Sequence, residues 1–225
     1  MSTKSFFLTA AIAALCTISQ SQAQVAIKAG VNFASIDESA TLEEYETLEN
    51  KSVAGFQAGI SFDLGLSDMF TIQPELLFIQ KGGRSTYGLS DNNKVETRLY
   101  YNYLEVPVLA KLKFFNESGS GAYVIGGPFI GLAMGGKSVT NTTLLGQTTR
   151  DEDDFKFDND DPGERQRRTD YGVSFGGGVK FGQIFLDARY NLGLNNLLDG
   201  DANNANDSKP FRRTRGIGLV MGYEF

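Results

Sequence analysis

Apolar and polar residues alternate with a period of two along most of the chain beyond residue 24. In the stretch 171–181, every second residue from Tyr171 onward reads Tyr, Val, Phe, Gly, Val and Phe, and the residues between them read Gly, Ser, Gly, Gly and Lys. An extended strand places these two sets on opposite faces. A helix would scatter both sets around its circumference, and so many glycines would weaken it. The pattern therefore predicts β-strands.

Eight segments show this alternation. They are 25–36, 53–64, 70–81, 97–115, 121–134, 169–181, 184–194 and 212–225. Several contain ten or more residues, which exceeds the roughly five to six residues of a typical soluble strand and approaches the length of a tilted transmembrane strand.

The connections between these segments alternate in length. The long ones are 37–52, 82–96, 135–168 and 195–211, and the short ones are 65–69, 116–121 and 182–183. Successive antiparallel strands put alternate connections at opposite ends of a sheet, so the short turns and both termini share one end. This arrangement predicts an all-β fold, an eight-stranded antiparallel up-and-down transmembrane β-barrel with four long external loops and short periplasmic turns. An even strand number lets the first and last strands pair, which leaves no open edge.

Alternation alone does not say which face of the sheet points inward. A soluble ligand-binding barrel of the lipocalin type would enclose the apolar face and remains a third interpretation. The predicted strand ends carry aromatic residues, as interfacial girdles of membrane barrels do, and these are Tyr100, Phe114, Tyr171, Tyr223 and Phe225. Many polar-face positions are Gly or Ser, which suits a narrow interior. We therefore expect the polar face to line the lumen.

Charged residues on the polar face would then meet inside the barrel. Those predicted to form a polar network in the lumen are Glu75, Glu105, Lys111, Asp187 and Arg189. Buried charges are tolerated when they are paired, so we expect Glu75 and Glu105 to meet Arg189 or Lys111. An eight-stranded lumen is only wide enough for side chains to fill it, which predicts a structural plug. The alternative is a gated pore or a binding pocket.

The N-terminal residues have the pattern of an export signal. Lys4 precedes an apolar stretch, 6–18, and Ser21-Gln22-Ala23 has the form of a cleavage site, so we expect a signal peptide over 1–23 and a barrel domain over 24–225. Removing Lys4 from 21 basic residues leaves 20 against 27 acidic ones, a net charge of −7. This balance argues against nucleic acid as a partner. The domain 24–225 has no cysteine, so no disulfide stabilises it.

Seven stretches carry a resemblance to a known family. They are KAGVNFASI, IQPELLFIQKGG, NYLEVPVLAKLKF, AYVIGGPFIGLAMGG, DYGVSFGGGVKF, LDARYNLGLNNL and GIGLVMGYEF. In order and spacing the chain resembles the PorT-like outer-membrane β-barrel family of Bacteroidetes-type bacteria. The resemblance implies an integral barrel of the cell outer membrane, and it implies that Phe225 is a terminal aromatic signal for the barrel-assembly machinery. The namesake is associated with protein secretion, but no motif here specifies that role.

The absence of histidine excludes most of the chemistry known for such barrels. No histidine is available as a general base for a serine nucleophile, and without histidine or cysteine in 24–225 a zinc site is not expected. A pair of carboxylates could serve a glycosidase, but Glu75 and Glu105 lie in the predicted packed lumen. We therefore expect no enzyme activity, no catalytic or metal-binding residues and no cofactor.

Two charged groups belong to the predicted external loops. Eight acids between Asp151 and Glu164 suggest calcium ligands, although their spacing is not that of an EF-hand and a solvated loop is the simpler explanation. The second group consists of arginines near the outer rim that could contact phosphate of lipopolysaccharide. They are Arg165, Arg167, Arg168, Arg212, Arg213 and Arg215.

Three prolines fall inside predicted strands. Proline donates no ladder hydrogen bond, so Pro74, Pro107 and Pro128 predict bulges or distorted pairing in a closed sheet.

The function predicted from these features is a structural or interaction role in the outer membrane, in which the loops contact lipopolysaccharide or envelope and secretion proteins. The alternative is a narrow porin-like channel for small solutes.

Overall fold

The computed structural model describes residues 24–39, 47–90, 92–155, 167–197 and 211–225, and the predicted signal peptide lies outside these ranges. The described residues form ten strands. They are β1 (Gln24–Ser39), β2 (Thr47–Lys51), β3 (Val53–Gly65), β4 (Phe70–Ser90), β5 (Asn93–Phe115), β6 (Gly121–Leu144), β7 (Gln147–Phe155), β8 (Thr169–Phe181), β9 (Ile184–Gly193) and β10 (Phe211–Glu224). These ranges contain no helix long and apolar enough to cross a bilayer.

Eight of the strands close into a ring. Their order is β1-β3-β4-β5-β6-β8-β9-β10, with every neighbour antiparallel. The ring is closed by the first and last strands, which pair from Ala26↔Glu224 to Ser39↔Phe211. Closure satisfies the backbone hydrogen bonds of both terminal strands, as a membrane-spanning sheet requires. The predicted antiparallel barrel is therefore confirmed.

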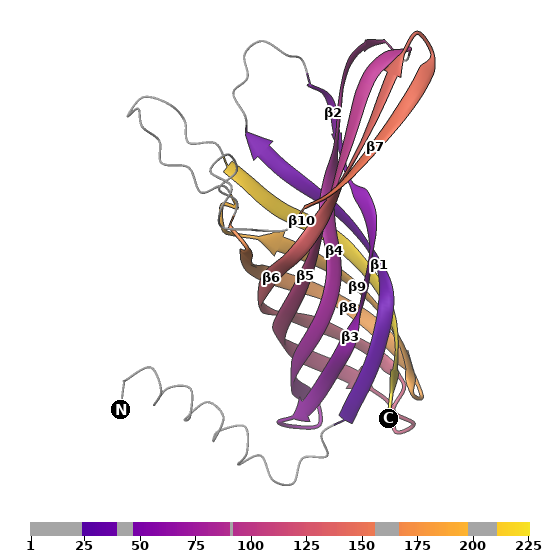
Figure 1. Ribbon diagram of the computed structural model, residues 1–225. Coiled ribbons are helices and arrows are strands. Elements are labelled where there is room, and N and C mark those ends of the chain that lie inside the picture. The colour runs from indigo at the N-terminus through magenta and orange to yellow at the C-terminus, as the bar shows by residue number, and fades with distance from the viewer. Residues whose placement is uncertain (1–23, 40–46, 91, 156–166, 198–210) are drawn as a thin grey trace, which may run out of the picture.

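The short turns and the described chain ends lie at one end of the barrel (Figure 1). The backbone N–H of Phe225 donates to the carbonyl of Val25 at 2.9 Å, so the C-terminus lies beside the start of β1. The turn at 116–120 is tied together by the side chain of Asn116, whose Oδ1 accepts from the N–H groups of Ser118 and Ser120.

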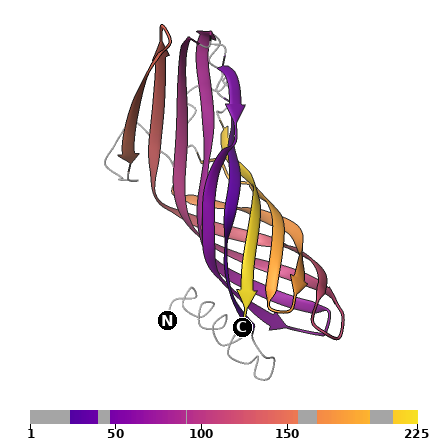
Figure 2. The same cartoon turned by 90° about the vertical axis from the view of Figure 1, so that its right-hand side faces the viewer.

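The opposite end is more ordered than the sequence predicted. The connections 82–96 and 135–168 were expected to be long loops, but β4, β5 and β6 continue far beyond the ring, and β7 adds to β6 as a hairpin. With β2 paired to β4, these strands form a projecting sheet in the order β2-β4-β5-β6-β7 (Figures 1 and 2). Most residues on both faces of this projecting sheet are polar, so its strands lack the apolar alternation from which their extent could be predicted.

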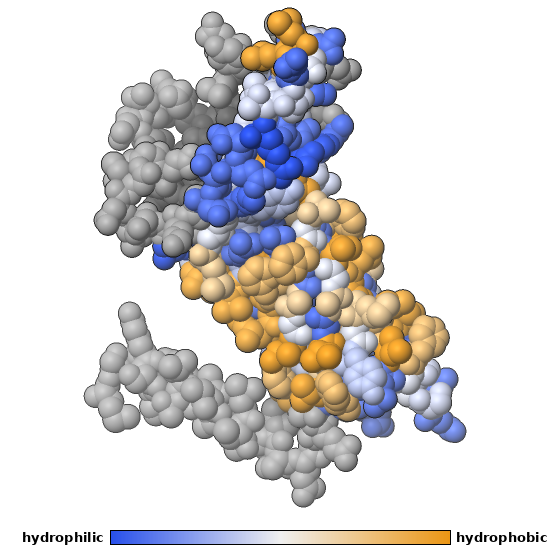
Figure 3. Space-filling model, turned by 45° about the vertical axis from the view of Figure 1, so that its right-hand side comes forward, coloured by the Kyte–Doolittle hydropathy of each residue, from blue (hydrophilic) through white to orange (hydrophobic). Residues whose placement is uncertain are grey.

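The alternation of the sequence becomes an outer belt and a filled interior. On β5, Leu104, Val106 and Val108 are 39–44% exposed, whereas Tyr103 and Leu109 are completely buried. On the face shown in Figure 3, apolar residues gather on the ring and form the belt, and hydrophilic residues lie above them on the projecting sheet. An apolar outer surface of this extent suits lipid rather than water. The expected orientation, with the polar face inward, is the observed one.

The prolines interrupt the ladder without shifting it. Between β3 and β4 the paired residues pass from Ser61↔Glu75 to Leu64↔Ile72, which skips Pro74 but keeps the register. The ladders β4–β5 and β5–β6 contain similar gaps beside Pro107 and Pro128. The pairing is thus distorted at each proline, but no bulge forms there. The irregularity of β5–β6 instead lies between Asn102 and Tyr103, near the start of the projecting sheet.

Aromatic rings share the interior with the charges. Phe185 and Tyr123 belong to a buried apolar cluster, and glycines opposite them leave room for their rings. A Cβ added to Gly222 would lie 2.1 Å from the Phe185 ring, and one added to Gly178 would lie 2.5 Å from the Tyr123 hydroxyl. These close approaches explain why the lumen face is rich in glycine.

Candidate functional site

The central group of lumen charges surrounds the carboxylate of Glu75. Arg189 on β9 donates to both oxygens of Glu75, at 2.8 and 3.4 Å, and also pairs with Asp187 two residues away. Lys28 on β1 forms a second ion pair with Glu75. The Tyr123 hydroxyl donates to Asp187. Two buried cations and two buried carboxylates therefore neutralise one another.

A second group lies nearer to the projecting sheet. The amino group of Lys81 is 2.6 Å from Glu105 and 3.0 Å from Asp170, and the Thr214 hydroxyl donates to Asp170 at 2.7 Å. Lys81 also lies 4.3 Å from the ring centroid of Phe129, which is within cation–π range.

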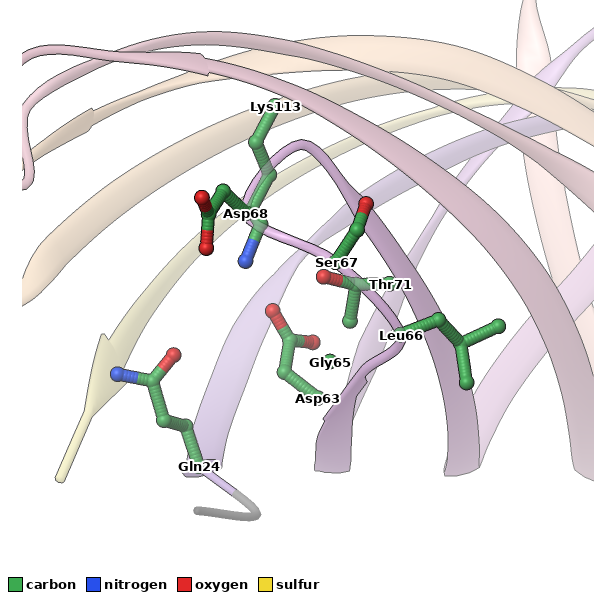
Figure 4. A pocket seen from close by; sticks show the side chains of 8 residues that line it. All are labelled: Gln24, Asp63, Gly65, Leu66, Ser67, Asp68, Thr71 and Lys113. Carbon is green, nitrogen blue, oxygen red and sulfur yellow. The ribbon is translucent and has the colours of Figure 1, made fainter. Parts of the chain in front are cut away.

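A third group lies at the short-turn end. Lys111 donates to Asp63 at 2.7 Å, and Lys180 pairs with Glu224. Beyond Asp63 the mouth opens into a pocket of about 450 Å³ between the start of β1 and the β3–β4 turn. In Figure 4 the amino group of Lys113 points toward the space between the carboxylates of Asp63 and Asp68. This mouth is polar and open to solvent.

The charges inside the barrel almost cancel. Among the described residues the buried cations are Lys28, Lys81, Lys111, Lys180 and Arg189, and the buried anions are Asp63, Glu75, Glu105, Asp170, Asp187 and Glu224. Five cations against six anions leave a net charge of −1, so the lumen has no strong field to select ions of one sign.

The structure places all five predicted network residues in the lumen, but it does not join them as one cluster. Arg189 brings Glu75 and Asp187 together, as expected for Glu75. Glu105 is paired with Lys81 rather than with the predicted partners, and Lys111 is paired with Asp63. The prediction of partners failed for these two because strand alternation specifies the face of a residue but not its height in the barrel.

Sequence reasoning also missed six charged members of the network. They are Lys28, Asp63, Lys81, Asp170, Lys180 and Glu224. All six occupy inward positions of predicted strands, so the same alternation rule could have found them. Completing the set of inward charges would have shown that anions and cations nearly balance.

Several buried polar atoms of the lumen have no hydrogen-bond partner. They include Oδ1 of Asn32, the hydroxyl oxygen of Tyr103 and Oδ1 of Asp170. Such atoms are costly when unsatisfied, so they mark positions where bound water or a rearranged side chain would be stabilising.

The predicted rim arginines occupy two sides of the outer mouth. Arg213 and Arg215 are exposed on β10, and Arg215 pairs with Asp37 at 2.7 Å. Arg212 borders a cavity of about 40 Å³ inside the mouth. Arg167 and Arg212 are linked through the backbone of buried Leu197, which accepts from Arg167 and donates to Arg212 at 2.8 and 2.9 Å. Arg168 is exposed, and Arg165 lies outside the described residues.

The acidic run predicted as a calcium site is only partly described. Residues 151–154 belong to β7, where Glu152 pairs with Lys137 and Arg150, and 156–164 lie outside the described residues. Within the described ranges, no group of three or more acidic or other metal-ligating side chains is arranged to hold a metal ion.

Comparisons with known proteins agree with this architecture. The model of the outer membrane protein beta-barrel domain family matches residues 18–199. A similar solved structure is Ail, the attachment invasion locus protein of Yersinia pestis, in complex with the heparin analogue sucrose octasulfate. It is 14% identical, with a TM-score of 0.41, over 90% of this chain and 99% of that chain. Neisserial surface protein A is 15% identical, with a TM-score of 0.42, and the match covers 89% of this chain and 97% of that chain. No curated protein sequence gives a significant match.

Proposed function

The chain belongs to the outer membrane protein beta-barrel domain family and is an integral β-barrel of the outer membrane, and from this premise we propose that it anchors an external interaction surface. The single observation that carries the proposal is the contrast between the two halves of the molecule. The ring has a lumen lined by buried ion pairs, whereas β4, β5, β6 and β7 extend well beyond it as a projecting sheet. A closed ring with a long projection suits contact better than transport.

We propose that the contacts are made with lipopolysaccharide and with envelope or secretion proteins. The rim arginines support the first, because guanidinium groups bind phosphate in a bidentate manner. Arg213 and Arg215 are exposed beside the outer mouth. The chain is proposed to be non-catalytic, since it has no histidine and its carboxylates are held in ion pairs.

We further propose a branch of the family, an export route and a recognition signal for this chain. The resemblance of the seven sequence stretches supports membership in the PorT-like branch of the family. Lys4, the apolar stretch 6–18 and the triplet Ser21-Gln22-Ala23 support export with removal of 1–23. The exposed Phe225 at the end of β10 supports recognition by the barrel-assembly machinery.

A narrow channel for small solutes is the second candidate function. It is favoured by the unsatisfied buried atoms of Asn32, Tyr103 and Asp170, which would be stabilised by a file of water in the lumen.

Planar-bilayer conductance of the purified protein separates the two candidates. A closed lumen predicts no large steady channels. Steady conductance that increases in the Arg189→Ala variant would instead show that the lumen charges gate a pore. Contact with lipopolysaccharide is tested by the amount retained by an Arg213→Gln/Arg215→Gln variant, which we expect to be lower than in the parent. The Lys113→Gln variant, changed at the opposite mouth, serves as the control.

A further inference from the structure

A polar pocket lies on the outer face of the projecting sheet, immediately above the apolar belt. It has a volume of about 360 Å³, and its side chains come from four neighbouring strands, β4, β5, β6 and β7. Those that matter here are Arg98, Tyr100 and Asn102 of β5, Lys137 of β6, and Arg150 and Asp154 of β7. Register brings them together, because Tyr100 is opposite Lys137 and Lys137 is opposite Asp154.

The pocket faces the same side as the lipid-facing residues. On β5, Asn102 and Tyr100 continue the even-numbered face that carries Leu104 and Phe114. From Phe114 to Leu104 the belt measures about 34 Å along the strand, at roughly 3.4 Å per residue. With a barrel tilt of about 40° this corresponds to about 25 Å of height, the usual thickness of the apolar band. The pocket therefore begins where the hydrocarbon region ends.

The chemistry of the pocket suits a phosphate. Arg98 pairs with Glu96 at 2.6 Å, whereas Lys137 and Arg150 share the single carboxylate of Glu152. In the lining itself three cations face one acid, Asp154. Tyr100 adds an aromatic ring of the kind that lies at the level of lipid headgroups.

We propose that this pocket binds the phosphorylated headgroup of a lipopolysaccharide molecule whose acyl chains lie against the belt below it. Arg98, Lys137 and Arg150 hold the phosphate, and Tyr100 and Asn102 contact the adjoining sugar. The inference rests on the proposed function, since it requires the projecting sheet to lie outside the cell. It differs from the rim contact because the pocket lies on β4, β5, β6 and β7, whereas Arg213 and Arg215 lie on β10.

The test measures binding of purified lipopolysaccharide, intact or dephosphorylated, to the detergent-solubilised full barrel. The Arg98→Gln/Lys137→Gln/Arg150→Gln variant is expected to lose at least about tenfold in affinity for the intact lipid, since it loses three charge-assisted contacts. The dephosphorylated lipid is expected to bind parent and variant equally weakly. Unchanged affinity of the variant, or equal binding of both lipids by the parent, overturns the proposal. Displacement by millimolar inorganic phosphate alone also overturns it, because the site would then recognise a free anion and not a lipid.

A second variant distinguishes loss of the binding site from loss of folding. Glu152→Gln releases Lys137 and Arg150 from their ion pairs, so it is expected to increase lipid affinity severalfold, and a decrease contradicts the site. Lys137→Arg keeps the charge and is expected to bind like the parent.

The rim variant Arg213→Gln/Arg215→Gln distinguishes failure of the pocket from failure of the proposed function. If only the rim variant loses lipid, the pocket fails and the proposed function stands. If neither variant loses lipid, both contacts fail. Orientation is checked independently by labelling a Leu145→Cys variant in intact cells with a membrane-impermeant maleimide, and lack of labelling refutes the proposed function itself.

Discussion

At the scale of single residues, the stability of the barrel depends on Arg189. Its guanidinium group is almost fully buried and is held by Glu75 and Asp187. Arg189→Ala leaves two carboxylates in the lumen with Lys28 as the nearest cation, so we expect the free energy of unfolding to fall by about 3–5 kcal/mol. Urea unfolding of the refolded barrel in micelles measures this loss.

The exposed pair Arg215–Asp37 provides the matched control. It joins the same chemical groups at 2.7 Å, but both side chains are largely exposed. Arg215→Ala should therefore cost no more than about 1 kcal/mol. Equal losses in the two variants would contradict the view that burial makes the lumen pairs important.

The ion pairs of β7 predict a dependence on pH. Hydrogen bonds from Lys137 and Arg150 hold the pKa of Glu152 below its ordinary value of 4.5. A lowered folded-state pKa stabilises the β6–β7 hairpin above pH 4.5, and this stabilisation is lost as the pH falls through the folded-state pKa. Amide exchange in 137–152 should therefore be independent of pH near neutrality, after correction for intrinsic rates, and should show more opening in acid. In Glu152→Gln this acid-induced increase should be absent, and its persistence would assign the effect to other groups.

At the scale of elements, the β6–β7 hairpin has an unusual turn. Leu145 and Gly146 both have positive φ, 51° and 78°, as a two-residue type I′ turn requires. Leucine is unfavourable in this conformation, and Leu145 is 89% exposed, so its side chain gains little from packing. Leu145→Asn should stabilise the hairpin by about 1 kcal/mol, measured as slower amide exchange at its tip. Gly146→Ala should destabilise the hairpin and speed amide exchange at its tip. Faster exchange in Leu145→Asn would contradict the view that Leu145 is strained.

The same turn explains why the extent of the strands was predicted poorly. Leu-Gly lacks the Asn-Gly signal of a type I′ hairpin, so 135–168 read as a loop. The strands of the projecting sheet lack one apolar face, so periodicity gave no indication that they continue past Lys81 and Met134. They are held by backbone pairing to neighbours that the sequence does not identify.

At the scale of the whole molecule, the ring depends on pairing between β1 and β10. Ala29 and Met221 are register partners on the lipid-facing side, and the domain 24–225 contains no cysteine. An Ala29→Cys/Met221→Cys variant should form a disulfide under mild oxidation, because directly opposed strand positions have suitable geometry. An Ala29→Cys/Leu186→Cys variant, with its second cysteine one strand further, should not. Gel migration reports the crosslink in both variants. Crosslinking in the second variant alone would show that β1 does not pair with β10 in this register.

The sequence by itself determined the class of fold, the number of strands in the ring and the side of each strand that faces lipid. Alternation has a period of two and connection lengths alternate between ends, so a residue such as Glu105 could be assigned to the lumen from its neighbours alone. Tertiary structure alone decided which charges meet. Glu105 pairs with Lys81 and Lys111 with Asp63 because the stagger between strands sets the height of each side chain. The pocket at Arg98, Lys137 and Arg150 likewise arises from three strands in register, a relation that no single segment carries.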